Sequence, residues 1–318
     1  MQRRTLLIAP LAGLAACAGD PVTDIAPRPA GFITPWRTLM GGFLAPALPT
    51  AAMPGAMPRP GSCAFVRLQS PGAIALRGQE LLVADLGSGR LWRADLGFNT
   101  LTPLAGTTAS PLTALMFGAD LSAWVLDAAS RQVLRFGRDG RLLQTWRTGT
   151  AAVSPAAIVL ADGGATLLVA DPGLAQWAEL RSGGALAQSV LPQHPGGARL
   201  LGVDALTLAG EQVAVLDRAA GAVHRVARDG RVLASLPWPA GVQAGALAAD
   251  RFGRIFLLDV AGRHVTVLQA GREPRVLDAA ALGAQQIGGL ALDERHLAVS
   301  DRLTGQVLIV TLAAEAAP

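Results

Sequence analysis

Six aspartates recur at nearly constant spacing, and each ends a short apolar run such as "LLVAD", "AWVLD" or "IFLLD". Their separations are 42, 44, 46, 42 and 42 residues, and the six are Asp85, Asp127, Asp171, Asp217, Asp259 and Asp301. A carboxylate at a strand end accepts hydrogen bonds from the backbone N–H groups of the following turn. Because architecture repeats and single chemical sites rarely do, we favour turn capping. The alternative is a ring of carboxylates that holds a cation.

Few other side chains in the sequence are suitable metal ligands. Asn occurs once, at Asn99, and four glutamates fall at expected strand ends or turns, where solvated carboxylates belong: Glu80, Glu179, Glu211 and Glu273. The histidines show no zinc-type spacing and occupy different positions of the repeat: His194, His224, His264 and His296. The sequence therefore predicts no metal and no other cofactor, with calcium as the alternative, and no catalytic residue.

The candidate ligand face carries the aspartate turns and three variable loops, at residues 148–155, 191–202 and 237–244. Variable loops on a rigid framework commonly carry recognition. His194 and Arg199 lie in the longest of these loops, so they join the six aspartates as candidate ligand-face residues. Trp146 and Trp238 are interpreted as packing residues of outer strands, with anchoring of a partner as the alternative.

The elements that position these residues form a repeat. A second short apolar strand precedes each aspartate run, a third follows it, and in five repeats a fourth comes next. Four antiparallel strands in about 42 residues make one propeller blade. Two joining turns read "RDGR", at residues 138–141 and 228–231, and Asp-Gly predicts a primed turn with positive φ at both central residues.

The sixth repeat lacks a fourth strand, because only six residues follow position 312. An apolar segment, "CAFVRLQ" at residues 63–69, stands ahead of the first repeat and is expected to complete the sixth blade. Without it the ring would end in an unpaired edge. The sequence thus predicts an all-β, six-bladed β-propeller of four-stranded antiparallel blades over residues 63–312, closed by an N-terminal strand that completes the last blade.

The repeat unit resembles the NHL repeat, the blade sequence of many six-bladed propellers. The shared pattern is a small residue and "A-L", then "L-x-V-x-D", then "G-x-V" and "D-G", and it covers about 250 residues. The departure from the family is the near absence of Asn after the aspartates. Related propellers include calcium-dependent lactonases, whose central Glu/Asn/Asp cluster has no counterpart that we can match in this sequence.

The N-terminus "MQRRTLLIAPLAGLAAC" is typical of a secretory signal, with two arginines and an apolar run too short to span a bilayer. "LAAC" resembles the bacterial lipobox, so we expect residues 1–17 to be a signal peptide and Cys17 to be lipidated. Ordinary cleavage is the alternative, and the export route, general or twin-arginine, stays open. The Pro/Ala-rich residues 18–62 are expected to form a tether, and residues 313–318 a short tail.

The charge pattern does not indicate nucleic-acid binding. The net charge is only +4, every basic residue is Arg, and the arginines alternate with acidic residues.

From the N-terminal signal and the repeats we expect an outer-membrane lipoprotein that faces the periplasm. We expect it to be a binding or scaffold module for a protein or another envelope component. A metal-dependent hydrolase or lactonase, or a ligand-sensing propeller, is the alternative.

Replacing Cys17 tests the anchor. Cys17→Ser removes the thiol that would carry the acyl group, so we expect palmitate incorporation to disappear and the protein to leave the membrane fraction. Radiolabelling of cells followed by immunoprecipitation measures the first effect. Unchanged labelling in the Cys17→Ser protein would contradict lipidation at this residue.

Overall fold

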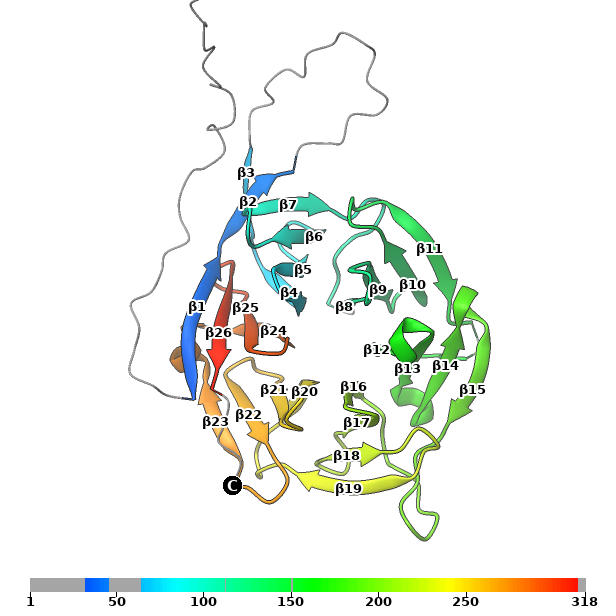
Figure 1. Cartoon of the computed structure of the whole chain (residues 1–318). Helices are drawn as coiled ribbons and strands as arrows, with labels where there is room; N and C mark the ends of the chain where they lie inside the picture. The colour runs from blue at the N-terminus through cyan, green and yellow to red at the C-terminus, as the bar shows by residue number, and fades with distance from the viewer. Residues whose placement is uncertain (1–31, 46–63, 112, 150, 314–318) are drawn as a thin grey trace, which may run out of the picture.

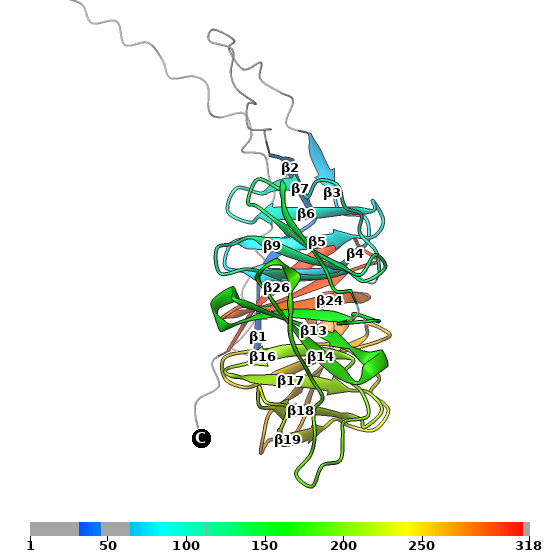
Figure 2. The same ribbon diagram turned by 90° about the vertical axis from the view of Figure 1, so that its right-hand side faces the viewer.

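The computed structural model describes residues 32–45, 64–111, 113–149 and 151–313. In these ranges the chain forms six four-stranded antiparallel blades arranged as a ring around a central axis, as predicted (Figure 1). Figure 2 shows the ring edge-on. None of the helices in the described ranges is long and apolar enough to cross a membrane. Cys17, Cys63 and the predicted signal peptide lie outside the described residues.

Each blade runs from an inner strand at the axis to an outer strand at the perimeter. Blades 1 to 3 comprise β4 (Pro71–Arg77) to β7 (Thr100–Pro103), β8 (Thr113–Phe117) to β11 (Leu142–Arg147), and β12 (Ala157–Ala161) to β15 (Leu186–Val190). Blades 4 and 5 comprise β16 (Ala205–Ala209) to β19 (Val232–Pro237), and β20 (Ala244–Ala249) to β23 (Arg275–Asp278). Blade 6 contains β24 (Ile287–Leu292), β25 (His296–Asp301), β26 (Gln306–Leu312) and β1 (Ile33–Leu39).

The second strand of every blade is the most buried, which explains why it reads as a continuous apolar run. These strands are β5 (Glu80–Asp85), β9 (Ala123–Asp127), β13 (Thr166–Asp171), β17 (Gln212–Asp217), β21 (Ile255–Asp259) and β25. In β5, the side chains from Leu81 to Ala84 are fully buried. A strand covered on both faces needs apolar residues at successive positions rather than alternation.

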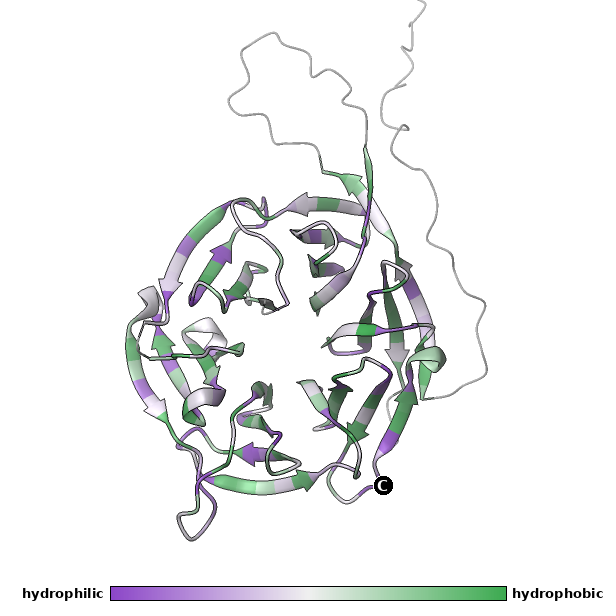
Figure 3. Cartoon of the chain, turned by 180° about the vertical axis from the view of Figure 1, so that it is seen from behind, coloured by the Kyte–Doolittle hydropathy of each residue, from purple (hydrophilic) through white to green (hydrophobic). Residues whose placement is uncertain are grey.

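The hydrophobic core is divided into six parts, and each part lies between two neighbouring blades. One cluster joins Ile74 and Trp92 of blade 1 to Val307 and Ile309 of blade 6, and five similar clusters fill the other junctions. Figure 3 shows the apolar residues distributed around the whole ring. Stability therefore comes from contacts between blades, so the first and last blades must also be joined.

The strand that completes blade 6 differs from the one expected. β1 pairs antiparallel with β26 from Ile33 opposite Leu312 to Leu39 opposite Val307. The ring is closed by an N-terminal strand, as predicted, but that strand comes from the segment assigned to the tether at residues 18–62. The assignment of residues 63–69 to this role was wrong, and so was the start of the propeller at residue 63. The low apolar periodicity of residues 33–39 hid a strand that lies at a sheet edge.

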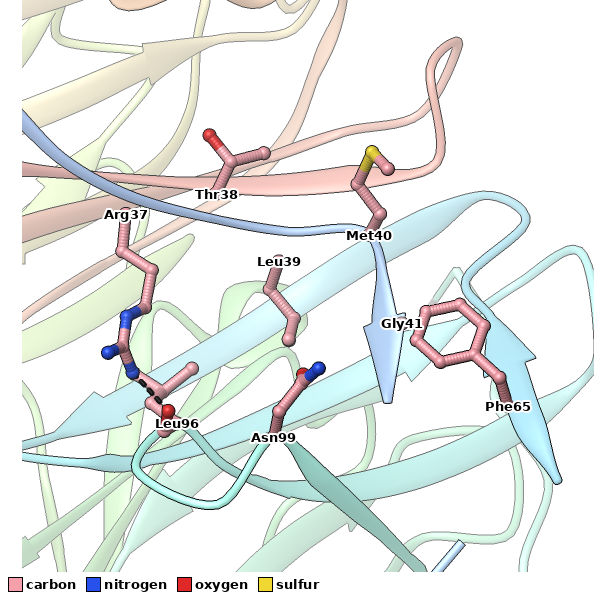
Figure 4. A pocket seen from close by; sticks show the side chains of 8 residues that line it. All are labelled: Arg37, Thr38, Leu39, Met40, Gly41, Phe65, Leu96 and Asn99. Carbon is pink, nitrogen blue, oxygen red and sulfur yellow. Dashed lines mark hydrogen bonds between the residues drawn. The ribbon is translucent and has the colours of Figure 1, made fainter. Parts of the chain in front are cut away.

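The expected closing segment instead extends blade 1. β3 (Phe65–Arg67) pairs with β2 (Gly41–Leu44), and β2 runs parallel to β7, so this sheet has six strands. Gly41 permits the close pairing of β2 and β3, because a Cβ there would lie 2.0 Å from the Val66 carbonyl oxygen. Figure 4 shows the junction, where the Arg37 guanidinium donates to the Leu96 carbonyl oxygen. The chain from β1 to β2 thus ties blade 6 to blade 1.

The two "RDGR" turns have a different geometry from the predicted one and an additional role. Only the glycines, Gly140 (φ 75°) and Gly230 (φ 92°), have positive φ, so the turns are not of the primed type. The first arginine of each turn reaches the preceding blade. Arg138 Nη2 lies 2.8 Å from Glu80 Oε1, and Arg228 Nη2 lies 2.9 Å from Glu179 Oε1.

Glu80 and Glu179 are therefore buried and ion-paired rather than solvated, which corrects the sequence-based expectation. Burial alone would raise the pKa of Glu80, but the guanidiniums of Arg93 and Arg138 lower it below its usual value. The charge is thus compensated where it is buried. The repeated turn joins neighbouring blades as well as two strands.

Shortening a buried side chain of β1 tests whether this strand closes the ring. Leu39 is 4% exposed and packs in the cluster between blades 6 and 1, so Leu39→Ala is expected to lower the free energy of unfolding by about 2–4 kcal/mol. Phe65→Ala, at a side chain that is 42% exposed on β3, should cost less than about 1 kcal/mol. Urea unfolding of both variants measures the difference. Equal losses would contradict closure through β1.

Candidate functional site

The axis of the ring is lined by the inner strands, which carry one branched aliphatic side chain each at the same height. We call this ring of side chains the waist, and it separates two cavities. Six residues form it, and each lines both cavities: Ile74, Leu115, Ile158, Leu206, Leu247 and Leu290. One cavity opens toward the aspartate turns, and we call it the Asp-turn cavity. The other opens on the opposite face. The waist is apolar throughout, so the centre of the ring carries no ionisable group.

The Asp-turn cavity is wide because the inner strands carry small residues on this side of the waist. The position before each waist residue is Ala or Gly: Ala73, Ala114, Ala157, Ala205, Ala246 and Gly289. The volume is about 970 Å³. Sites for small molecules commonly measure about 300–1,000 Å³ and have mostly apolar walls. The cavity is therefore large enough for a whole small ligand.

The rim of the cavity is formed by the residues that directly follow the six repeated aspartates. All six line it: Leu86, Ala128, Pro172, Arg218, Val260 and Arg302. The repeated carboxylate thus fixes a turn whose next side chain lies at the cavity mouth. The position after Asp varies from blade to blade while the Asp does not, so it sets the chemistry of the rim. Four of these residues are apolar and two are cationic.

The aspartates cap their turns, as predicted. Asp301 accepts from the backbone N–H of Leu303 (3.1 Å) and from the Thr304 hydroxyl (2.7 Å). It also accepts from the N–H groups of Gln285 (2.9 Å) and Gln286 (3.1 Å), which lead into the inner strand of the same blade. The carboxylate therefore joins two loops of one blade, a link that the sequence analysis did not anticipate.

The six aspartates fall into two groups. Four are fully buried and bond both to their own turn and to the loop before the inner strand: Asp85, Asp171, Asp217 and Asp301. Asp127 and Asp259 are partly exposed and cap only their own turns in the described part of the chain. These two belong to blades 2 and 5. Within the described residues, no three His, Cys, Asp or Glu side chains are placed to hold a metal ion.

The turns and loops that these carboxylates bind also carry large, exposed apolar side chains. Backbone N–H groups of Val153, Leu174, Leu201 and Leu303 donate to Asp171, Asp217 or Asp301, while their side chains are exposed. Val260, which follows Asp259, is 64% exposed. We call these five residues the apolar crown. Exposed apolar side chains that gather on one face indicate a binding surface.

Arg218 and Arg302 lie across the mouth of the cavity. The Arg218 Nη2 atom donates to the Gly245 carbonyl oxygen (2.9 Å) on the inner strand of blade 5, and the Arg302 Nη2 atom donates to the Gly288 carbonyl oxygen (3.3 Å) on the inner strand of its own blade. A Cβ at Gly288 would lie 2.7 Å from Cγ and Nε of Arg302, so the glycine makes room for this side chain. Arg131 is a third arginine in the lining. The rim therefore offers cationic hydrogen-bond donors above an apolar floor.

The carboxylates of the lining are already engaged. Asp204 accepts from the Arg218 backbone N–H (2.9 Å), and its other oxygen lies 4.0 Å from the Arg218 Nε atom. Asp259 faces its own turn and lies 3.6 Å from His264 Nδ1. Within the described residues Arg302 forms no ion pair. Arg131 likewise has no carboxylate partner among the described residues, so the lining holds two uncompensated cations.

His194 and Arg199 do not line the cavity. The connection between β15 and β16 that contains them projects outward from the ring (Figure 1). The His194 ring instead packs against His224 of blade 4, with ring centroids 5.2 Å apart. Arg199 is exposed and pairs with Gln193 within the loop. Position in the longest loop was therefore a poor guide to position near the axis.

His224 is buried and lies near Asp217. Its Nδ1 is 2.8 Å from the Ser235 hydroxyl, and its Nε2 is 3.8 Å from the nearer oxygen of Asp217. Burial lowers the pKa of His224 below its usual value, Asp217 opposes that shift, and His194 adds to it. The His224 ring is therefore neutral and packed in blade 4. The sequence carries no signal for this cluster, because its members come from a loop and from separate strands.

The remaining candidates have structural roles. His296 stacks on Trp36 of β1 with centroids 4.1 Å apart, so it supports ring closure. Trp146 is buried against Trp124, and the Trp238 indole N–H donates to the Val242 carbonyl oxygen (3.0 Å). Both tryptophans pack as interpreted from the sequence.

The cavity on the opposite face is smaller, about 720 Å³. Its charged lining comes from Arg77 and from the turn that contains Asp293, Glu294 and Arg295. Arg77 donates to the Gly118 carbonyl oxygen (2.7 Å), and His296 lies 3.1 Å from Asp293. Arg77, Asp293 and His296 are thus engaged with one another or with backbone, and this cavity is the smaller of the two, so the Asp-turn cavity is the stronger candidate site.

No protein family model matches this sequence, and no curated protein matches it. Solved structures do resemble it. Virginiamycin B lyase from Staphylococcus aureus has a TM-score of 0.57 and 10% identity over 78% of this chain and 96% of that one. A putative gluconolactonase has a TM-score of 0.52 and 17% identity over 77% of this chain and 89% of that one.

A structural genomics protein of unknown function from Bacteroides thetaiotaomicron has a TM-score of 0.59 and 12% identity, covering 80% of this chain and 72% of that one. At such identities the likeness shows the propeller fold alone. Membership of the NHL-repeat family stays a prediction.

Substitution of Asp301 tests the double cap. The folded-state pKa of Asp301 lies below its ordinary value of 3.8: burial raises it, but the Gln285, Gln286 and Leu303 N–H groups and the Thr304 hydroxyl lower it by more. Its contribution to stability is thus complete above the unfolded-state pKa and is lost as pH falls through the folded-state pKa. Asp301→Asn should cost about 2 kcal/mol at neutral pH and flatten the acid limb of the stability curve.

Asp127→Asn is the matched control, because Asp127 is partly exposed and its hydrogen bonds given by the described residues go to its own turn. It should cost less than about 1 kcal/mol. Urea unfolding between neutral and acid pH measures both. An Asp301→Asn protein with the wild-type acid limb would contradict the assignment.

Proposed function

We propose that this chain is a binding protein of the cell envelope that takes a ligand or envelope component at its Asp-turn face. The observation that carries the proposal is the coincidence of a cavity of about 970 Å³, an apolar crown and cationic rim residues on one face. Cavities of this kind, with a few polar groups around an apolar interior, are the usual form of a small-molecule site.

Rigid backbone around the cavity supports binding at this face. The buried aspartates fix the turns and the loops before the inner strands, so the rim and the crown are held in place without a ligand. A preformed site loses less conformational entropy when it binds. Neither a protein partner nor a small molecule is favoured by the crown alone, since both bury apolar surface.

The second candidate is a metal-dependent hydrolase, lactonase or lyase on the same fold. Among the solved structures is a catalytically inactive histidine-to-alanine variant of the lyase from Staphylococcus aureus with quinupristin. In the present chain no histidine lines the Asp-turn cavity within the described residues, and its carboxylates, Asp204 and Asp259, are hydrogen-bonded to turns. Elemental analysis of the purified protein separates the candidates: stoichiometric, tightly held calcium or zinc would favour the enzyme.

We also propose the location. The signal-like N-terminus and the lipobox-like "LAAC" support an outer-membrane lipoprotein that faces the periplasm. A lipid anchor would place the propeller close to a membrane, where apolar and amphiphilic molecules are concentrated. This location gives the apolar crown a supply of suitable ligands.

Site-specific photo-cross-linking tests the proposed face. With a benzophenone amino acid at position 303 (Leu303, 65% exposed), we expect a defined cross-linked product in living cells because the crown contacts the bound component. Position 142 (Leu142, 47% exposed) lies on the outer strand of blade 2 and is the control. Mass spectrometry identifies the products. The same products at both positions, or none at position 303, would contradict binding at this face.

A further inference from the structure

We propose that the ligand of the Asp-turn cavity is an amphiphilic anion, a molecule with an apolar chain that enters the cavity and a carboxylate or phosphate that meets Arg302 and Arg218. This inference rests on the proposed function and specifies its ligand class. It follows from the arrangement of apolar and cationic residues around the cavity.

The cavity interior selects an apolar group. Its floor is the waist of Ile and Leu side chains, and its walls are the Ala and Gly residues that precede them. These side chains offer a polar group no hydrogen-bond partner, so at this depth partners come only from the backbone edges of the inner strands. An alkyl or acyl chain needs no such partner and gains about 25 cal/mol for each Å² of apolar area that it buries against the waist.

The rim carries cations that suit an anion. At the positions after the aspartates, Arg218 and Arg302 come from blades 4 and 6, while Leu86, Ala128 and Pro172 of blades 1 to 3 are uncharged. Arg131, in the turn of blade 2, adds a third guanidinium to the lining. Each guanidinium has five N–H groups. The described contacts of Arg302 use one of them, for the Gly288 carbonyl oxygen. The remaining donors suit a carboxylate or a phosphate.

The charge of Arg302 is not balanced within the protein, and that of Arg218 is balanced only in part. Asp204 lies 4.0 Å from the Arg218 Nε atom, beyond hydrogen-bond distance, whereas Arg302 has no carboxylate partner in the described residues. A cation beside a low-dielectric cavity attracts an anion more strongly than one in open water. The two ends of the site therefore require opposite properties of one molecule.

The apolar crown explains how such a molecule enters. Leu303 directly follows Arg302 in the sequence, and Val260 of blade 5 lies between Arg218 and Arg302 in the order of the turns. Both apolar side chains are largely exposed. An amphiphile that leaves a membrane exposes its chain to water, and apolar side chains around the mouth shorten that exposure. The crown thus belongs to the same site as the cavity.

Titration calorimetry with three probes of equal chain length tests the ligand class. We expect the purified protein to bind decanoate, to bind the neutral alcohol decanol about tenfold more weakly, and to bind decyltrimethylammonium more weakly still. Decyl phosphate, compared with decanoate, distinguishes a phosphate head from a carboxylate. All probes are used as monomers, below the concentrations at which they form micelles.

Variants assign the two parts of the site. Arg302→Gln should weaken decanoate binding about tenfold and leave decanol binding unchanged. Arg147→Gln, at an exposed arginine of the outer strand β11, should change neither. Ala157→Leu and Ala114→Leu reduce the cavity volume from two different blades and should weaken both probes. Urea unfolding verifies that each variant is folded.

Several outcomes would overturn the inference. Equal binding of decanoate and decanol would exclude a role for the arginines, and binding unaffected by Ala157→Leu and Ala114→Leu would place the probe elsewhere. Binding to anionic vesicles without binding of monomeric probes would indicate membrane docking instead. If no amphiphile binds but position 303 still gives a defined cross-link, the ligand class is wrong while the proposed binding face stands. Loss of both results removes the proposed function as well.

Discussion

The ladder between β1 and β26 is the constraint on which the rest of the molecule depends. Each of the six apolar clusters lies between two blades, so none is complete unless both neighbours are in place. In the described residues, the chain crosses the junction between blades 6 and 1 through β1 and the segment that leads to β2. Three residues of β1 contact these two blades. Arg37 donates to the Leu96 carbonyl oxygen of blade 1, Trp36 stacks on His296 of blade 6, and Leu39 packs in the cluster between them. With the ring closed, the inner strands lie at one radius and the waist forms.

The repeated aspartates connect this architecture to the candidate site. A carboxylate that accepts N–H groups from two loops removes unsatisfied donors and fixes the backbone of both. The residue after it then projects at the cavity mouth, and its neighbours expose apolar side chains. Structural and functional demands are thus met by adjacent positions: the Asp is constant, while the position after it is Leu, Ala, Pro, Arg, Val or Arg.

Arginines have different surroundings at the blade junctions and at the cavity mouth. At two junctions, Arg138 and Arg228 neutralise buried glutamates of the preceding blade. At the cavity mouth, Arg302 has no such partner within the described residues. A buried carboxylate without a cation would be costly, whereas an exposed guanidinium without an anion is tolerated because water solvates it. An unpaired arginine at a cavity mouth is therefore a feature that folding does not require, and binding offers a reason for it.

The sequence by itself determined the blade number, the strand order within a blade and the capping role of the aspartates. These features repeat six times, and each depends on short-range patterns: apolar runs, turn residues and spacing. It did not determine which N-terminal segment closes the ring, because residues 63–69 read as a short apolar strand whereas residues 33–39 did not, and only packing against blades 6 and 1 makes the latter the closing strand. It also did not reveal the buried ion pairs of Glu80 and Glu179, whose partners lie in another blade.

The candidate site was visible in the sequence only in part. The small residue before each Ile or Leu of the inner strands, and the variable position after each Asp, are both present in every repeat. Their meaning depends on six strands converging on one axis, which places residues up to 229 positions apart (Ala73 and Arg302) around a single cavity. Tertiary structure alone decided that Arg218 and Arg302 meet at that mouth while His194 and Arg199 lie away from it, because distance from the axis is not encoded in loop length.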